Sequence, residues 1–77
     1  MKHNRDDYNR IQDPENKIPA DEPVFLIRGQ DFVGHMAVRA WAHLHRVNGG
    51  SDVAYQAAMK QADLMEAWPK KKHADMP

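Results

Sequence analysis

The chain has 77 residues, of which 42% are hydrophobic and 29% are charged, and it contains no cysteine. A chain this short forms one small domain at most, and its core is too small to give a large stability without a further constraint. The lack of cysteine excludes disulfides, thiolate metal sites and cysteine nucleophiles. Eleven basic residues balance eleven acidic ones, which argues against a dedicated nucleic-acid-binding protein. Self-association is therefore the constraint that we expect to stabilise the fold.

Residues 1–22 are predicted to form an extended or disordered polar arm. The segment is rich in charged residues, and its apolar side chains are few and scattered. Such a segment cannot bury enough surface to order itself. Nothing in the sequence resembles a signal peptide or a membrane span, so we expect no membrane partner and a cytoplasmic location.

Residues 23–69 are predicted to form the folded domain, which begins with a short strand. Four consecutive apolar residues occupy positions 24–27, and Gly29 follows them. This run is typical of a strand that is buried on both faces. Because a lone strand leaves its backbone groups without partners, either the arm or the same strand of another copy must pair with it.

Two helices are predicted after the strand. Asp31 is the expected N-cap of a helix over residues 32–47, and residues 48–50 (NGG) end that helix in a turn. Ser51 is the expected N-cap of the second helix, which runs to about residue 68, where Pro69 stops it. On the first helix one arc of roughly 100° collects the apolar residues Val33, Met36, Ala37, Ala40, Leu44 and Val47.

The predicted fold class is mainly α with one short strand (α+β). A disordered arm, a strand and an antiparallel helical hairpin follow one another, and residues 70–77 form a basic flexible tail. The apolar side of the second helix is wider than one partner helix needs, so we expect homo-oligomerisation, with a dimer favoured, to complete the fold. The predicted interface consists of Val24, Phe25, Leu26, Ile27, Trp41 and Trp68.

A stripe of basic residues on the first helix is the main candidate site. His35, Arg39, His43 and Arg46 are separated by four, four and three residues, so they share one side of a helix. Together with Arg28, which lies at the end of the strand, they could bind a phosphate or a carboxylate. The alternative is a solvated helix face whose cations pair with acids of the arm.

Catalysis and metal binding have little support in the sequence. The only serine, Ser51, is explained by its helix cap, and no other nucleophile is evident. His43 and His45 point about 200° apart on a helix, and His35 lies roughly 12 Å along the axis from His43, so no two of them can share one metal ion within a chain. We therefore expect no enzyme activity, no metal site and no cofactor.

Three segments carry a resemblance to a known group of proteins: residues 18–31 (IPADEPVFLIRGQD), residues 38–42 (VRAWA) and residues 65–69 (MEAWP). In these segments the chain resembles small uncharacterised proteins encoded by bacteriophages and prophages. The resemblance extends over about residues 12–72. It implies a phage accessory role, acting on host machinery or host defence in the host cell cytoplasm, but assigns no functional residue.

The sequence thus predicts a small phage accessory binding protein that antagonises a host process, with host defence as the first candidate. It would block a protein surface of the host or sequester an anionic ligand such as a nucleotide. Two alternatives stay open. One is a structural or assembly component of the phage particle, and the other is a weak nucleic-acid-binding protein that uses the lysines at positions 70–72.

Overall fold

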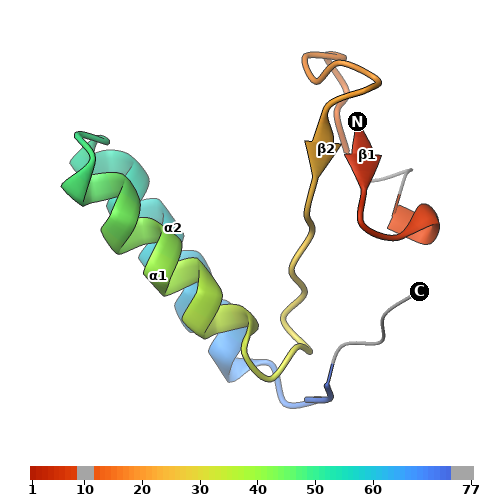
Figure 1. Ribbon diagram of the computed structural model, residues 1–77. Coiled ribbons are helices and arrows are strands. Elements are labelled where there is room, and N and C mark those ends of the chain that lie inside the picture. The colour runs from red at the N-terminus through yellow and green to blue at the C-terminus, as the bar shows by residue number, and fades with distance from the viewer. Residues whose placement is uncertain (9–11, 74–77) are drawn as a thin grey trace.

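The computed structural model describes residues 1–8 and 12–73 (Figure 1). Two antiparallel helices lie side by side, and a pair of very short strands lies apart from them, joined to the helices by an extended segment. Along the chain the elements are β1 (Lys2–His3), the 3-10 helix η1 (Asp6–Tyr8), β2 (Pro23–Val24), α1 (Gly34–Val47) and α2 (Asp52–Ala67). The predicted mainly helical α+β class with an antiparallel helical hairpin is therefore confirmed.

The hairpin turn follows the sequence signals closely. Gly49 has a φ of 90°, a left-handed conformation that a residue with a side chain rarely adopts. The backbone N–H of Gly50 donates to the carbonyl of His45 at 2.8 Å and closes the end of α1. Ser51 then caps α2, since its hydroxyl oxygen accepts a hydrogen bond from the N–H of Ala54 at 3.1 Å. Both predicted cap positions of the turn are confirmed.

The predicted strand over residues 24–27 is too long, because β2 ends at Val24. Its partner is supplied by the arm: β1 pairs with β2 in parallel, with Lys2 opposite Pro23 and His3 opposite Val24. The partner strand contains only two residues, so the ladder cannot extend along β2. Beyond it Phe25 is 66% exposed, and the expectation of burial on both faces is wrong at this position.

The start of α1 also differs from the prediction. The helix begins at Gly34 rather than at residue 32, and its N-cap is Val33. Asp31 acts earlier, in the turn before the helix, where its carboxylate accepts from the N–H of Val33 at 3.0 Å. Its carbonyl accepts from the N–H of Gly34 at 3.1 Å. Asp31 therefore stabilises the turn that precedes α1 and does not cap the first turn of the helix.

The chain after α2 returns to this same turn. The N–H of Lys72 donates to the carbonyl of Gln30 at 2.8 Å, and the N–H of Phe32 donates to the carbonyl of Lys72 at 3.1 Å. These bonds place residues 70–73 beside residues 30–32. The predicted tail continues to residue 77, and positions 74–77, like positions 9–11 of the predicted arm, lie outside the described residues.

The buried apolar core is small. Among the described residues it consists of Ala42 and Ala62, both fully buried, and Met65, which is 8% exposed. All three lie where α1 and α2 meet. In contrast, the apolar arc of α1 faces outward, and Leu44 and Val47 are 63% and 83% exposed. None of the helices in the described part of the chain is both long and apolar enough to cross a membrane.

Glycine is required at position 34 because residues 27 and 28 pass close to its backbone. A Cβ atom at this position would lie 2.8 Å from the carbonyl oxygen of Arg28 and 3.0 Å from a methyl group of Ile27. We expect Gly34→Ala to destabilise the fold by about 1–3 kcal/mol, because the backbone must shift, although alanine normally favours a helix. Chemical denaturation measures the change.

Gly29→Ala is the matched control. A Cβ there meets its nearest atoms at 3.6 Å, which is ordinary van der Waals contact, so the free energy of unfolding should stay close to that of the wild type. Equal effects of the two alanine substitutions would contradict the close approach at Gly34.

Candidate functional site

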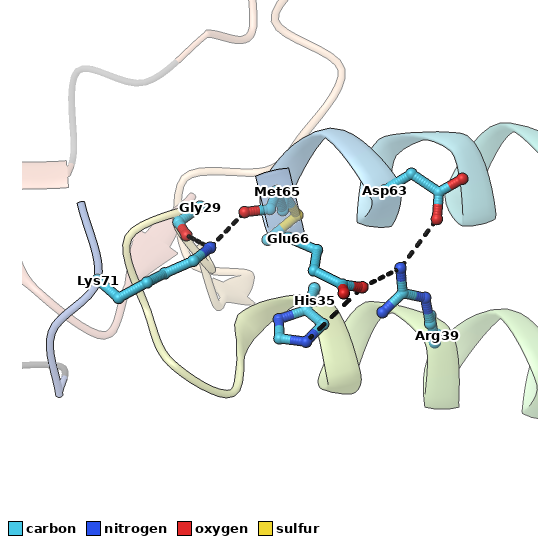
Figure 2. Close-up of polar contacts among 7 residues, drawn as sticks. All are labelled: Gly29, His35, Arg39, Asp63, Met65, Glu66 and Lys71. Carbon is cyan, nitrogen blue, oxygen red and sulfur yellow. Dashed lines mark hydrogen bonds and ion pairs between the residues drawn. The ribbon is translucent and has the colours of Figure 1, made fainter. Parts of the chain in front are cut away.

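The predicted basic stripe lies beside α2, where His35 and Arg39 are largely covered and His43 and Arg46 stay exposed. Arg39 projects from α1 towards α2, where its Nη2 atom lies 2.8 Å from Oδ1 of Asp63 and 2.7 Å from Oε1 of Glu66 (Figure 2). Nε2 of His35 lies 4.0 Å from the same oxygen of Glu66. The exposed fractions of the two side chains are only 25% for Arg39 and 13% for His35.

The two carboxylates hold the charge of Arg39. Hydrogen bonds from the guanidinium to Asp63 and then to Glu66 raise the pKa of Arg39 above its ordinary value, with the negative charges of both acids adding to the effect. A raised pKa favours the charged form, so the part of the stability that comes from the charge of Arg39 is present below that raised value and is lost as the pH rises through it.

The other two members of the stripe contact the start of α2. Nη2 of Arg46 lies 3.4 Å from Oδ1 of Asp52, and its guanidinium carbon lies 4.3 Å from the ring centre of Tyr55. The ring of His43 lies 5.3 Å from that of Tyr55. All four stripe residues thus contact α2, and we call His35, Arg39, His43 and Arg46, with the α2 side chains that they contact, the polar seam. The structure does not bring Arg28 into this group.

Arg28 instead lines a pocket of about 440 Å³ between the turn before α1 and the C-terminal end of α2. The volume is in the range of small-molecule sites. Arg28 and Lys70 supply two positive charges at its rim, and Gln30 and Gln61 supply side-chain amides. The remaining side chains that line it are apolar: Leu64, Met65 and Trp68.

The electrostatic character of the pocket follows from the polar seam. Among the described residues no carboxylate lines the pocket, since the acids of the last turns of α2, Asp63 and Glu66, point towards Arg39 on α1 (Figure 2). Within residues 1–8 and 12–73, neither Arg28 nor Lys70 forms an ion pair. Two uncompensated cations beside apolar and amide groups favour an anionic ligand.

Lys71 fixes the wall of the pocket. Its ammonium group donates to the carbonyl oxygen of Gly29 at 2.7 Å and to that of Met65 (Figure 2). The carbonyl of Met65 also accepts from the N–H of Trp68 at 3.2 Å, and it lies in the last turn of α2, where a positive charge is favourable. One side chain therefore links the turn at residues 28–30 to the end of α2, the two segments that form the pocket.

Sequence reasoning found this site only in part. Arg28 was predicted as a ligand-binding residue and Trp68 as an interface residue, whereas Gln30, Gln61, Leu64 and Lys70 were not singled out for this role. Lys70 was assigned to the basic tail, and only the pairing of residues 70–73 with residues 30–32 places it beside Arg28. Within the described ranges, no three histidine or carboxylate side chains are grouped so that they could hold a metal ion.

Comparison with protein-family models, with curated proteins and with solved structures gave no match.

The contribution of the polar seam to stability can be measured at Arg39. We expect Arg39→Gln to lower the melting temperature by a few degrees, because it leaves Asp63 and Glu66 without their shared cation, and we expect the loss to shrink at high salt. Arg28→Gln is the control, since it removes a cation that has no ion pair in the described part of the chain. Equal melting temperatures of the two variants would show that the seam does not stabilise the hairpin.

Proposed function

We propose that the protein binds and sequesters a small anionic ligand, such as a nucleotide, in the pocket lined by Arg28, Trp68 and Lys70. This is the sequestering form of the host-antagonist role, with host defence as the first candidate, that the resemblance to phage proteins suggests, and it would operate in the cytoplasm of the host cell. The observation that carries the proposal is the charge of the pocket, which has two cations and no carboxylate among its lining residues.

The lining residues suit the parts of such a ligand. The guanidinium of Arg28 can form two parallel hydrogen bonds to a phosphate, and the ammonium of Lys70 adds a second positive charge. The indole of Trp68, which is 51% exposed, offers a face on which a planar ring can stack. The amides of Gln30 and Gln61 can donate and accept, as the edge of a base or a sugar hydroxyl requires.

The same lining favours capture over catalysis. Among the described residues it contains no serine, threonine, cysteine, histidine or carboxylate, which leaves Lys70 as its one side chain of a type that acts as a nucleophile or general base. We therefore propose that a bound ligand is retained unchanged, and that the protein acts by lowering the free concentration of that ligand.

Of the residues predicted to bind an anion, Arg28 is the one that we retain for this role. The charge of Arg39 is already opposed by two carboxylates, at 2.7 and 2.8 Å, and a ligand phosphate would have to displace them. The ammonium of Lys71 is similarly engaged by two carbonyl groups, which leaves the lysine run at positions 70–72 less suited to a nucleic-acid backbone.

We also propose that the working form is a homo-oligomer, with a dimer as the simplest case. Three apolar residues form the buried core in the described part of the chain. A core of this size gives little stability to a single small domain, and association with further copies would bury more apolar surface.

Nucleotide binding can be tested by calorimetric titration with a panel of nucleoside mono- and diphosphates, with the free nucleosides and inorganic phosphate as references. We expect at least one nucleotide to bind, and Arg28→Gln or Lys70→Gln to weaken it about tenfold or more, because hydrogen bonds to charged groups contribute roughly 1.5–3 kcal/mol. Arg46→Gln is the matched control, because Arg46 belongs to the stripe and contacts the start of α2, away from the pocket, and its affinity should equal that of the wild type. If Arg46→Gln abolishes binding and Arg28→Gln does not, the ligand binds at the stripe and the pocket assignment is wrong.

A further inference from the structure

One face of α1 is exposed in the part of the chain that the structure describes. We call it the outer face, and it consists of Val33, Met36, Ala37, Ala40, Trp41, Leu44 and Val47. Its five larger side chains are between 52% and 83% exposed, and both alanines are exposed as well. Exposed apolar surface on this scale, in a helix that already packs against another helix, typically marks an interaction site.

The polar seam explains why this face is turned outward. Arg39 and Arg46, the two charged residues of α1, both contact acids of α2. The side of α1 that packs against α2 therefore holds the cations and two of the histidines, and the opposite side holds the apolar residues. The hairpin closes through its polar residues and leaves its most hydrophobic face exposed.

The spacing on the outer face is that of a helix-packing seam. Val33, Ala37, Ala40, Leu44 and Val47 are separated by four, three, four and three residues. This alternation brings apolar side chains to one line along a helix and allows the knobs of one helix to fit the holes of another. The small alanines at the centre, flanked by larger residues at both ends, permit two such helices to approach closely.

We infer that the outer face of α1 packs against the outer face of α1 in a second copy of this chain. The inference rests on the proposed self-association and names the surface that forms it. No charged residue lies on this face, so two identical faces meet without repulsion between like charges, as a two-fold contact requires. The matching face of α2, formed by Val53, Ala57, Leu64 and Ala67, is interrupted by Lys60 at the same spacing, and pairing it with itself would oppose two ammonium groups.

The exposed area of the outer face is of the size that pairing with a second copy requires. The exposed side chains of the outer face hold on the order of 500 Å² of apolar surface, so pairing two copies removes at most on the order of 1,000 Å² from water, the size at which specific interfaces begin. Two paired hairpins form an arrangement of four helices whose core would contain the outer faces. The pocket lies at the end of α2 and contains no residue of the outer face.

The chain offers a matched pair of substitutions for the test. Leu44 lies on the outer face and is 63% exposed, and Leu64 lies on α2 and is 61% exposed. Each is three residues from the end of its helix, so Leu44→Lys and Leu64→Lys add the same charge at a matched position and exposure, and of the two only Leu64 also lines the pocket. Circular dichroism checks that both variants keep their helices.

Sedimentation equilibrium of the full-length protein then measures the mass. We expect the wild type and Leu64→Lys to form particles of at least twice the 8.9 kDa of one chain. For Leu44→Lys we expect the dissociation constant of the assembly to rise about tenfold or more. Dissociation of Leu64→Lys alone would overturn the inference and leave self-association through α2. A wild type that is monomeric at every concentration tested would overturn both the proposed surface and the proposed self-association. Nucleotide titration of the same sample would report separately on the pocket.

A second measurement covers the case in which Leu44→Lys loses its helices. The chain contains no cysteine, so Ala40→Cys introduces a single thiol near the middle of α1. We expect mild oxidation to link two copies of Ala40→Cys and to leave Ala57→Cys, on the exposed side of α2, unlinked. Linkage of Ala57→Cys alone would contradict the proposed surface.

Discussion

The contact of Arg39 with Asp63 and Glu66 determines how the two helices face each other. One guanidinium on α1 binds two carboxylates that are three residues apart on α2, so it fixes both the rotation of each helix and their register. The Arg39 side chain is 25% exposed, whereas Asp63 and Glu66 are 73% and 56% exposed, so solvent reaches the contact from the α2 side and weakens it. The three residues of the buried core, Ala42, Ala62 and Met65, lie along the same line of contact.

Two features of the molecule depend on this orientation. The acids near the end of α2 are turned towards α1, so no acid of the described residues pairs with Arg28 or Lys70 in the pocket beside Trp68. At the same time the apolar residues of α1 are turned away from α2. A single polar contact thus separates a basic pocket at one end of the hairpin from an apolar face along its outer side, and the proposed functions of these two surfaces do not interfere.

The sequence predicts the elements of this fold well, because their signals are local. Gly49 and Ser51 mark the turn between the helices through a backbone conformation and a side-chain hydrogen bond that depend on adjacent residues alone. The length of the strand is not predictable in this way, since β2 extends only as far as the two residues of β1 allow. The start of α1 is also not predictable, because the carboxylate of Asp31 accepts a hydrogen bond in the turn before the helix. An aspartate in such a turn and an aspartate at an N-cap look the same in the sequence.

The orientation of the helices and most of the pocket could not be predicted from the sequence. Periodicity identifies the residues that share a face, as it does for Val33, Leu44 and Val47, but not the surface that the face contacts. An apolar helix face normally packs inside its own chain. In α1, however, the side that packs against α2 is the one that carries Arg39 and its ion pairs. The pocket joins Arg28 to Lys70 through backbone pairing between segments about 40 residues apart, which no local pattern records.

A charge exchange between α1 and α2 tests the central contact most directly. Thermal unfolding would be measured for Arg39→Glu, for Glu66→Arg and for the double variant. If Arg39 and Glu66 orient the helices as described, each single variant places like charges together and lowers the melting temperature, and the double variant recovers a large part of the loss because opposite charges meet again. Losses that simply add in the double variant would show that the two side chains do not interact, and would contradict the orientation on which both surfaces depend.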